Sequence, residues 1–224
     1  MTFNNEKKQI TIPKNQFPEQ IIGFIDNSIV YDSSCSKEAT VYYIKKDCGY
    51  FLKVAPKNTL ETESVMTKYF HSKGLSAEVC LYFQDDKDYL ITKQINGEDG
   101  TSAFHLSNPE KLCETFAKTL AKLHQLDFND CPLVSKTASF VPSHENTCLI
   151  HGDYCLPNII MNEFIFTGLI DLDHAGIGDP HRDICSALWT LNHNLKTDRY
   201  NDLFLNYYGK EKIDPERLKM WTGS

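Results

Sequence analysis

The chain has 224 residues, of which 41% are hydrophobic and 24% are charged, values typical of an ordinary folded globular protein. Its formal net charge of -7 argues against a nonspecific nucleic-acid binder, which needs a basic surface. The longest apolar runs, such as residues 21–25, are too short to cross a bilayer, and residues 1–8 lack the apolar stretch of a signal peptide, so we expect a cytoplasmic protein with neither a nucleic-acid nor a membrane partner.

Residues 20–95 are expected to form mainly strands, because β-branched and aromatic side chains gather in short runs separated by polar turns. The predicted elements of this half are hairpin strands at 39–44 and 50–54, a helix at 60–71, and a second strand pair at 79–83 and 89–91. Residues 96–100 hold two glycines and three turn-forming polar residues, which indicates a boundary between two halves of the chain.

After this boundary the pattern becomes mainly helical. Asn108, Pro109 and Glu110 are typical of an N-cap, a first-turn proline and an acidic first turn. An apolar stripe at helical spacing follows, formed by Leu112, Phe116, Leu120 and Leu123. Further predicted elements are a short strand at 148–150, a hairpin of strands at 159–161 and 164–170, and a helix at 184–195, whereas 132–147 is irregular.

The eight cysteines are expected to be free thiols. No C-x-x-C pair occurs, which disfavours a structural zinc site, and a chain of this size needs no disulfides to be stable.

Polar residues of catalytic type gather near predicted short strands in the second half. Asp153 and Asn158 lie five residues apart in a loop, and Asp171 directly follows an apolar strand. Loop and strand-end side chains of this kind can converge on one point, and their oxygens are the ligands that Mg²⁺ prefers beside water and phosphate.

These residues carry a resemblance to a known family. His151-Gly152-Asp153, with Asn158 five residues after the aspartate, resembles the catalytic loop of the aminoglycoside phosphotransferases and is similar to the H-R-D-x-x-x-x-N loop of protein kinases. Asp171, which follows Ile170, resembles the metal-binding aspartate of the D-F-G segment, and the likeness is greatest to the 3'-phosphotransferases. It implies an α+β, protein-kinase-like fold of two lobes: a small β-rich N-lobe at 1–95, a mainly helical C-lobe at 96–224, and a hinge at 92–100.

The resemblance also implies roles on the nucleotide side. Lys53 would pair with the nucleotide phosphates, and Glu63 would orient it, with Glu61 as the alternative. Ser36 would contact a phosphate, and the backbone near Lys93 and Ile95 would bind adenine. ATP is the expected nucleotide, with GTP left open because the hinge contacts are made by backbone atoms.

The remaining roles complete a phosphoryl-transfer site. Asn158 and Asp171 would hold Mg²⁺, Asp153 would orient the acceptor hydroxyl and take its proton, and Asp183 would be the buried aspartate that steadies the catalytic loop. The expected acceptor is a small cationic or hydroxylated molecule, in the first place an aminoglycoside antibiotic, whose phosphorylation confers resistance.

Other functions stay open at this stage. One is a kinase for another hydroxyl substrate, of choline, sugar or homoserine type, and another is a truncated nucleotide-binding remnant. Relative to the family, the segment 133–150 is short, and the chain stops near the point where a last helix would begin. A two-metal hydrolase is a further alternative, because His and Asp side chains are dense between Asp171 and Asp183.

Overall fold

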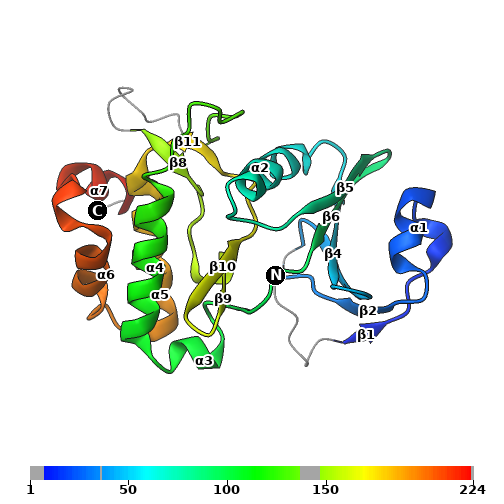
Figure 1. The fold of residues 1–224 in the computed structure, drawn as a ribbon, viewed down its shortest axis with the longest axis horizontal. Coiled ribbons are helices and arrows are strands. Elements are labelled where there is room, and N and C mark those ends of the chain that lie inside the picture. Colours follow the sequence, from blue (N-terminus) through cyan, green and yellow to red (C-terminus); the bar gives the residue numbers. More distant parts are fainter. Residues whose placement is uncertain (1–7, 36, 137–146, 223–224) are drawn as a thin grey trace.

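The β-rich first half forms an antiparallel sheet of six strands, in the order β1-β2-β3-β4-β6-β5. The computed structural model describes residues 8–35, 37–136 and 147–222. The strands are β1 (Gln9–Ile10), β2 (Ile29–Asp32), β3 (Thr40–Lys45), β4 (Tyr50–Pro56), β5 (Val79–Gln84) and β6 (Lys87–Lys93). The two predicted strand pairs are confirmed, and the sheet fills the right-hand half of the view in Figure 1.

The apolar run at residues 21–25 forms a helix, which is an exception within a stretch that the sequence predicts to be mainly strand. It belongs to α1 (Glu19–Ile25), which follows Pro18 and buries Ile21 and Ile25, one helical turn apart. Side chains four residues apart share a face both in a helix and in a strand. The spacing of Ile21 and Ile25 therefore does not tell the helical period of 3.6 residues from the strand period of two.

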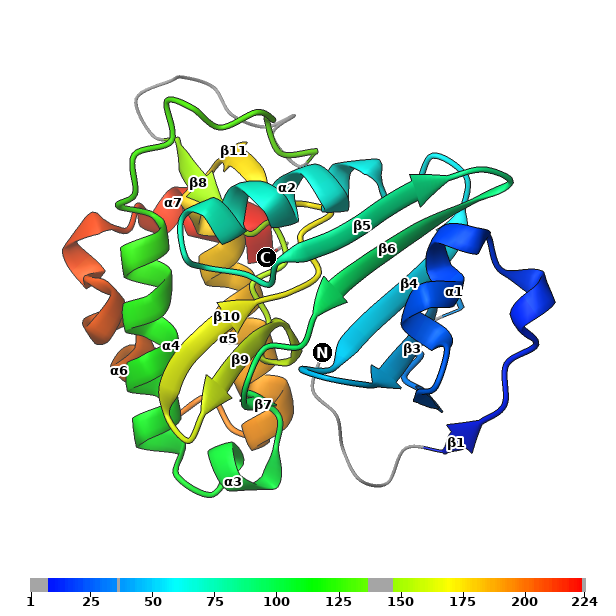
Figure 2. The ribbon, with the colours of Figure 1, turned by 45° about the vertical axis from the view of Figure 1, so that its right-hand side comes forward.

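The helix α2 (Glu61–Ser72) lies between the sheet and the helical half, as Figures 1 and 2 show. Its buried residues Met66, Tyr69 and Phe70 pack in the same apolar cluster as the helices of the second half. The segment after it continues this attachment, because the Leu75 carbonyl accepts a hydrogen bond from the Leu169 amide at 2.8 Å. The helix therefore joins the first half to the core of the second.

The second half combines helices with two small sheets, in which β10-β9-β7 form one and β11-β8 the other. The strands are β7 (Glu98–Asp99), β8 (Cys148–Ile150), β9 (Ile159–Asn162), β10 (Ile165–Leu169) and β11 (Gly176–Gly178). The helices are α3 (Ala103–Leu106), α4 (Pro109–Leu123), α5 (Pro180–Leu195), α6 (Asn201–Tyr208) and α7 (Pro215–Thr222). Short 3-10 turns occur at Lys14–Gln16, Leu156–Asn158 and Lys210–Lys212.

Helix α4 has the start and the buried face that the sequence predicts. The Asn108 side chain accepts a hydrogen bond from the Lys111 amide at 3.2 Å, and the apolar stripe is almost fully buried. Helix α5 begins four residues earlier than predicted, because Asp179 caps it by accepting from the His181 amide at 3.0 Å and Pro180 occupies its first turn. Within the described ranges, no helix is long and apolar enough to cross a membrane.

A buried carboxylate stabilises the turn that leads into α2. Asp88 is fully buried and accepts hydrogen bonds from three backbone amides, those of Asn58, Thr59 and Leu60, at 3.1, 2.9 and 2.9 Å. Burial alone raises the pKa of Asp88, but these hydrogen bonds outweigh burial, and its pKa lies below the usual value.

Replacing Asp88 by Ala is expected to lower the free energy of unfolding by about 2–4 kcal/mol, because three backbone amides, including that of the buried Leu60, lose their acceptor. Since the folded-state pKa is depressed, the stabilisation by Asp88 is present above the unfolded pKa of about 4 and is lost as the pH falls through the folded value. Urea unfolding of both proteins between pH 3 and 7 should show their difference shrinking at the acid end. An equal difference at every pH would contradict this account.

Candidate active site

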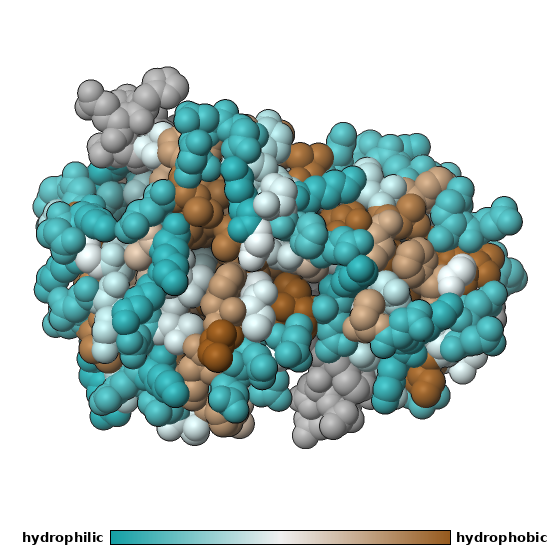
Figure 3. Space-filling model, in the orientation of Figure 1, coloured by the Kyte–Doolittle hydropathy of each residue, from teal (hydrophilic) through white to brown (hydrophobic). Residues whose placement is uncertain are grey.

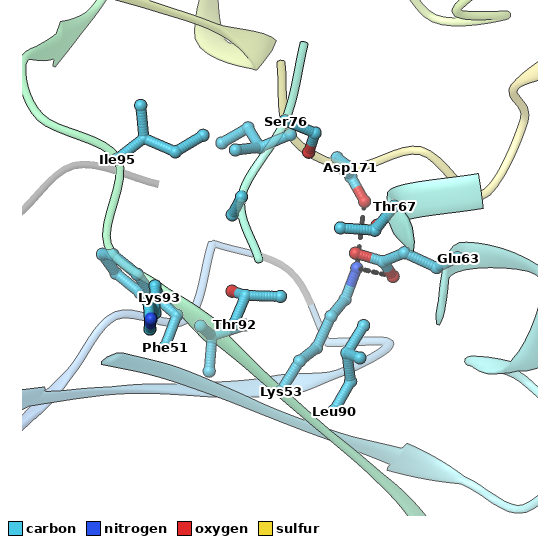
Figure 4. A pocket seen from close by; sticks show the side chains of 13 residues that line it. Phe51, Lys53, Glu63, Thr67, Ser76, Leu90, Thr92, Lys93, Ile95 and Asp171 are labelled. Carbon is cyan, nitrogen blue, oxygen red and sulfur yellow. Dashed lines mark hydrogen bonds and ion pairs between the residues drawn. The ribbon is translucent and has the colours of Figure 1, made fainter. Parts of the chain in front are cut away.

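Three charged side chains from separate elements meet at the mouth of a pocket between the sheet and the second half. Lys53, on the central strand β4, contacts the Glu63 carboxylate of α2 at 2.6 Å and the Asp171 carboxylate at 2.9 Å. Figure 4 shows the Lys53 ammonium between these two carboxylates. Glu63, and not the exposed Glu61, therefore holds the lysine.

The charges of this group stabilise one another against the effect of burial. Burial lowers the pKa of Lys53, but the adjacent Glu63 and Asp171 carboxylates raise it by a larger amount. The net pKa lies above the usual value, so the ammonium stays charged. Burial raises the pKa of Asp171, yet the Lys53 ammonium outweighs it and the pKa is lowered. At Glu63, which is 7% exposed, burial dominates and the pKa is raised.

Replacing Glu63 by Gln is expected to lower kcat/KM for the nucleotide roughly 10- to 100-fold, because Lys53 loses the negatively charged partner that holds it in place. Glu61→Gln is the matched control on the same helix turn and should stay within about twofold of the wild type, because Glu61 is exposed. Steady-state kinetics with varied nucleotide would test the pair. Equal losses in both variants would contradict the assignment.

The loop between β8 and β9 places Asp153 and Asn158 side by side. The Asn158 amide nitrogen donates to the Asp153 carbonyl at 2.9 Å and to the Asp153 Oδ2 at 3.0 Å. The Cys155 thiol donates to the other carboxylate oxygen at 3.3 Å, and burial, with the Asp153 charge, raises the pKa of this thiol and keeps it protonated. The Asp153 carboxylate is thus oriented by two neighbours.

Asp183 fixes the start of this loop. It is fully buried on α5 and accepts hydrogen bonds from the His151 amide at 2.7 Å and the Gly152 amide at 2.8 Å. Gly152 has a φ of +81°, and a Cβ there would lie 2.2 Å from the His174 carbonyl oxygen, so only glycine fits. His151 is buried and contacts the Ile170 carbonyl at 3.0 Å through Nε2, as a hydrogen-bonding residue of the loop.

Asp171 is joined to the loop through its backbone. The backbone amide of Ile170 donates to the backbone carbonyl of Asn158 at 3.0 Å. This hydrogen bond holds the segment of Asp171 beside that of Asn158, the other candidate metal ligand. Asp171 itself has a φ of +61°, a conformation that is uncommon for a residue with a side chain and frequent at functional sites. Sequence patterns did not predict this conformation.

The pocket beside Lys53 is lined by both halves of the chain. Lys93 and Ile95 border it, the Lys93 ammonium is paired with the Glu78 carboxylate at 2.6 Å, and the Lys93 amide donates to the Glu78 carbonyl at 3.0 Å. Ser36 lies outside the described residues. Sequence reasoning missed the apolar walls of the pocket, which are formed by Val41, Phe51, Leu90 and Ile170. The alternation of inward and outward side chains along the strands could have indicated them.

The dense aspartates and histidines of the hydrolase alternative have separate partners. Asp173 pairs with Lys136 at 2.8 Å, Asp179 contacts His181 and Arg217, each at 2.7 Å, and Asp183 holds the loop amides. Across the described part of the chain, no group of three or more His, Cys, Asp or Glu residues is arranged to hold a metal ion. The geometry thus separates the side chains on which that alternative depends.

Comparison with known proteins gives the context for this geometry. Residues 135–221 match the model of a phosphotransferase enzyme family. A probable aminoglycoside 3'-phosphotransferase of Lactococcus lactis is 39% identical over 250 aligned residues, which cover 95% of each chain. The chain belongs to the aminoglycoside phosphotransferase family. An aminoglycoside 3'-phosphotransferase of Niallia circulans is 28% identical, with 81% of this chain and 85% of the relative covered.

Solved aminoglycoside phosphotransferases share the fold, which confirms the predicted two-lobed, kinase-like α+β class. The crystal structure of an aminoglycoside-3'-phosphotransferase of type VIII has a TM-score of 0.72 at 20% identity, covering 84% of this chain and 89% of that one. An aminoglycoside phosphotransferase from Streptomyces rimosus has a TM-score of 0.71 at 18% identity, covering 90% and 93%. Membership in this phosphotransferase family makes the chain a small-molecule kinase.

The alignment also shows that this family member is internally short. It extends over 250 positions, whereas the whole chain has 224 residues, so the Lactococcus relative has internal residues without a counterpart here. The sequence predicts a shortened segment at 133–150, of which residues 137–146 lie outside the described part of the structure.

Proposed function

We propose that this enzyme transfers the γ-phosphoryl group of ATP to a hydroxyl group of an aminoglycoside and so confers resistance. The observation that carries the proposal is the convergence of the Lys53–Glu63–Asp171 group with the loop of Asp153 and Asn158 through the Ile170–Asn158 hydrogen bond. The names of the Lactococcus and Niallia relatives, both aminoglycoside 3'-phosphotransferases, support this acceptor class.

The nucleotide would occupy the pocket between the lobes, 1–95 and 96–224, at the hinge 92–100. Lys53 pairs with the α- and β-phosphates, Glu63 keeps the lysine in place, and Ser36 contacts a phosphate. The backbone at Lys93 and Ile95 binds the adenine ring, and because backbone atoms make these contacts, GTP is a possible second donor. ATP and its divalent cation are cytoplasmic, which places the reaction there.

Asn158 and Asp171 fit a magnesium ion. The Asn158 nitrogen is turned toward Asp153, so its Oδ1 oxygen can face a cation, and Lys53 contacts only one oxygen of the 46% exposed Asp171 side chain. When bound, Mg²⁺ neutralises charge on the nucleotide phosphates, with water and phosphate as its other ligands.

Asp153 orients the acceptor hydroxyl and takes its proton. Its two oxygens already receive hydrogen bonds from Asn158 and Cys155, so the carboxylate is held in one orientation before the acceptor arrives. Phosphoryl transfer depends mainly on alignment and charge neutralisation, and these residues supply both.

A coupled ADP-release assay with ATP, Mg²⁺ and kanamycin tests the proposal. Turnover that requires kanamycin, and that is absent with tobramycin, which lacks the 3'-hydroxyl, would support phosphorylation at that position. Absence of turnover with every aminoglycoside, together with thermal stabilisation by Mg·ATP, would contradict the acceptor and retain the kinase. Absence of both would contradict the proposal as a whole.

A further inference from the structure

A second cavity, separate from the nucleotide pocket, is lined by residues of the catalytic loop and of helix α5. It has a volume of about 510 Å³ and is bordered by Asp153, so the proposed base belongs to its wall. This volume is within the range of small-molecule sites. An acceptor must reach Asp153 to be phosphorylated, and this cavity gives the space for it.

The charge of this cavity is close to neutral. Among the described lining residues, the charged ones are Asp153 and Arg182, of opposite sign. Arg182 is held in place, because its Nε donates to the Gly152 carbonyl at 3.2 Å and its guanidinium lies over the Trp221 ring at 5.5 Å. On the face of the molecule drawn in Figure 3, hydrophilic side chains cover much of the surface and apolar side chains gather in smaller patches.

An aromatic platform forms part of the wall. Trp189 lines the cavity and remains 62% exposed, although large apolar side chains are usually buried. Its ring is stacked on His193, one helical turn further along α5, with the ring centroids 5.1 Å apart and the planes at 11°. A tryptophan fixed in this way offers a flat surface for a sugar or other ring.

The cavity also has uncharged acceptor atoms. The Oδ1 oxygens of Asn192 and Asn201 are shielded from solvent and accept no hydrogen bond from the described part of the chain, and both residues line the cavity. Because both oxygens are shielded, either amide has to rotate to present its oxygen to a donor on a bound ring. A neutral amide oxygen can accept the hydrogen bond of a hydroxyl group. A buried ammonium group needs a carboxylate in addition, to offset the free-energy cost of its desolvation.

We infer that the acceptor site of this enzyme selects a ring that carries hydroxyl groups over one that carries ammonium groups, with the ring stacked on Trp189 and its hydroxyls directed to Asn192 and Asn201. One carboxylate, Asp153, balances about one positive charge, and additional ammonium groups on the same ring have no described carboxylate to pair with. The inference rests on the proposed function, because it names the kind of aminoglycoside that the same site prefers.

Two pairs of antibiotics isolate this effect. Paromomycin and neomycin B differ at one position of the ring that bears the 3'-hydroxyl, with a hydroxyl in the first and an amine in the second, and kanamycin A and kanamycin B differ in the same sense. We expect kcat/KM to be roughly tenfold higher for the hydroxyl member of each pair. Equal values, or a preference for the amine member, would overturn the inference.

Variants test the contributions of Asn192 and Trp189 to acceptor binding. Asn192→Asp keeps the side-chain size and adds a carboxylate, so it should reduce the preference for the hydroxyl member at least threefold. Trp189→Ala should lower kcat/KM for all four acceptors roughly tenfold and leave the KM for ATP unchanged, and Trp189→Phe should retain most activity. Phe104→Ala, which removes a half-exposed aromatic ring outside the cavity, is the matched control and should have no effect. An unchanged preference in folded Asn192→Asp, or equal losses in Trp189→Ala and Phe104→Ala, would also overturn the inference.

The failure of this inference and the failure of the proposed function give different results. Turnover of all four antibiotics without preference retains the aminoglycoside kinase and removes the proposed selectivity. Absence of turnover with all four, while Mg·ATP still stabilises the protein, removes the aminoglycoside assignment itself and the inference that depends on it.

Discussion

The Asp153→Asn variant is expected to lose about 10²- to 10⁴-fold in kcat while its affinity for ATP stays within about twofold of the wild type. Asparagine has the same shape, but its single carbonyl oxygen can accept from only one of Asn158 and Cys155, and it cannot take the proton of the acceptor hydroxyl. Asp153 does not line the nucleotide pocket, so binding and chemistry should separate. Single-turnover kinetics beside nucleotide titration would measure the two effects independently.

Asp202→Asn is the control for this experiment. Asp202 is an exposed carboxylate of α6 whose side chain is 81% accessible and pairs with the exposed Lys210. The same loss of charge at that position should change kcat by less than about twofold. Comparable losses at both positions, or a loss of ATP affinity in Asp153→Asn, would contradict the role of Asp153 as base.

The second large effect is expected at Asp183. Replacing it by Ala leaves the His151 and Gly152 amides without their buried acceptor, and His124 loses a contact at 3.2 Å. We expect the free energy of unfolding to fall by about 3–5 kcal/mol, because removal of the buried carboxylate leaves its hydrogen-bond donors without an acceptor. Because these amides fix the loop that orients Asp153, the folded fraction should also be at least about tenfold less active.

Asp183→Asn separates the two consequences. Its single carbonyl oxygen can accept from one of the two amides, so it should recover part of the stability and little of the activity. Chemical denaturation followed by circular dichroism, with activity measured at a temperature where each variant is folded, would compare them. Wild-type activity in a folded Asp183→Ala variant would contradict the positioning role.

The long, strongly patterned elements could be predicted from the sequence. Helix α4 has a proline and an N-cap at its start and an uninterrupted apolar stripe, so its local signals and its packing agree. Strands β3 and β4 are similarly rich in residues that favour sheets. The short strands β1 and β7, with two residues each, have no such pattern, because they exist only through pairing with distant partners.

The candidate site was predicted through the order of its residues rather than through their geometry. Sequence spacing placed Glu63 ten residues after Lys53, and the structure brings their charged atoms within 2.6 Å, but no local signal predicted that Lys53 would also reach Asp171, 118 residues away. The left-handed conformation of Asp171 depends on tertiary contacts. Such features follow from packing, which a single sequence does not encode locally.

The position of α2 limits how the molecule can be divided. Its apolar face is part of the core of the second half, while Glu63 on the same helix is ion-paired to the sheet of the first half. A fragment cut at the linker after β6 would leave Met66 and Phe70, both fully buried in the whole chain, facing solvent. We therefore expect the two lobes to unfold together, and exchange of either lobe for a foreign module would require a redesigned surface on this helix.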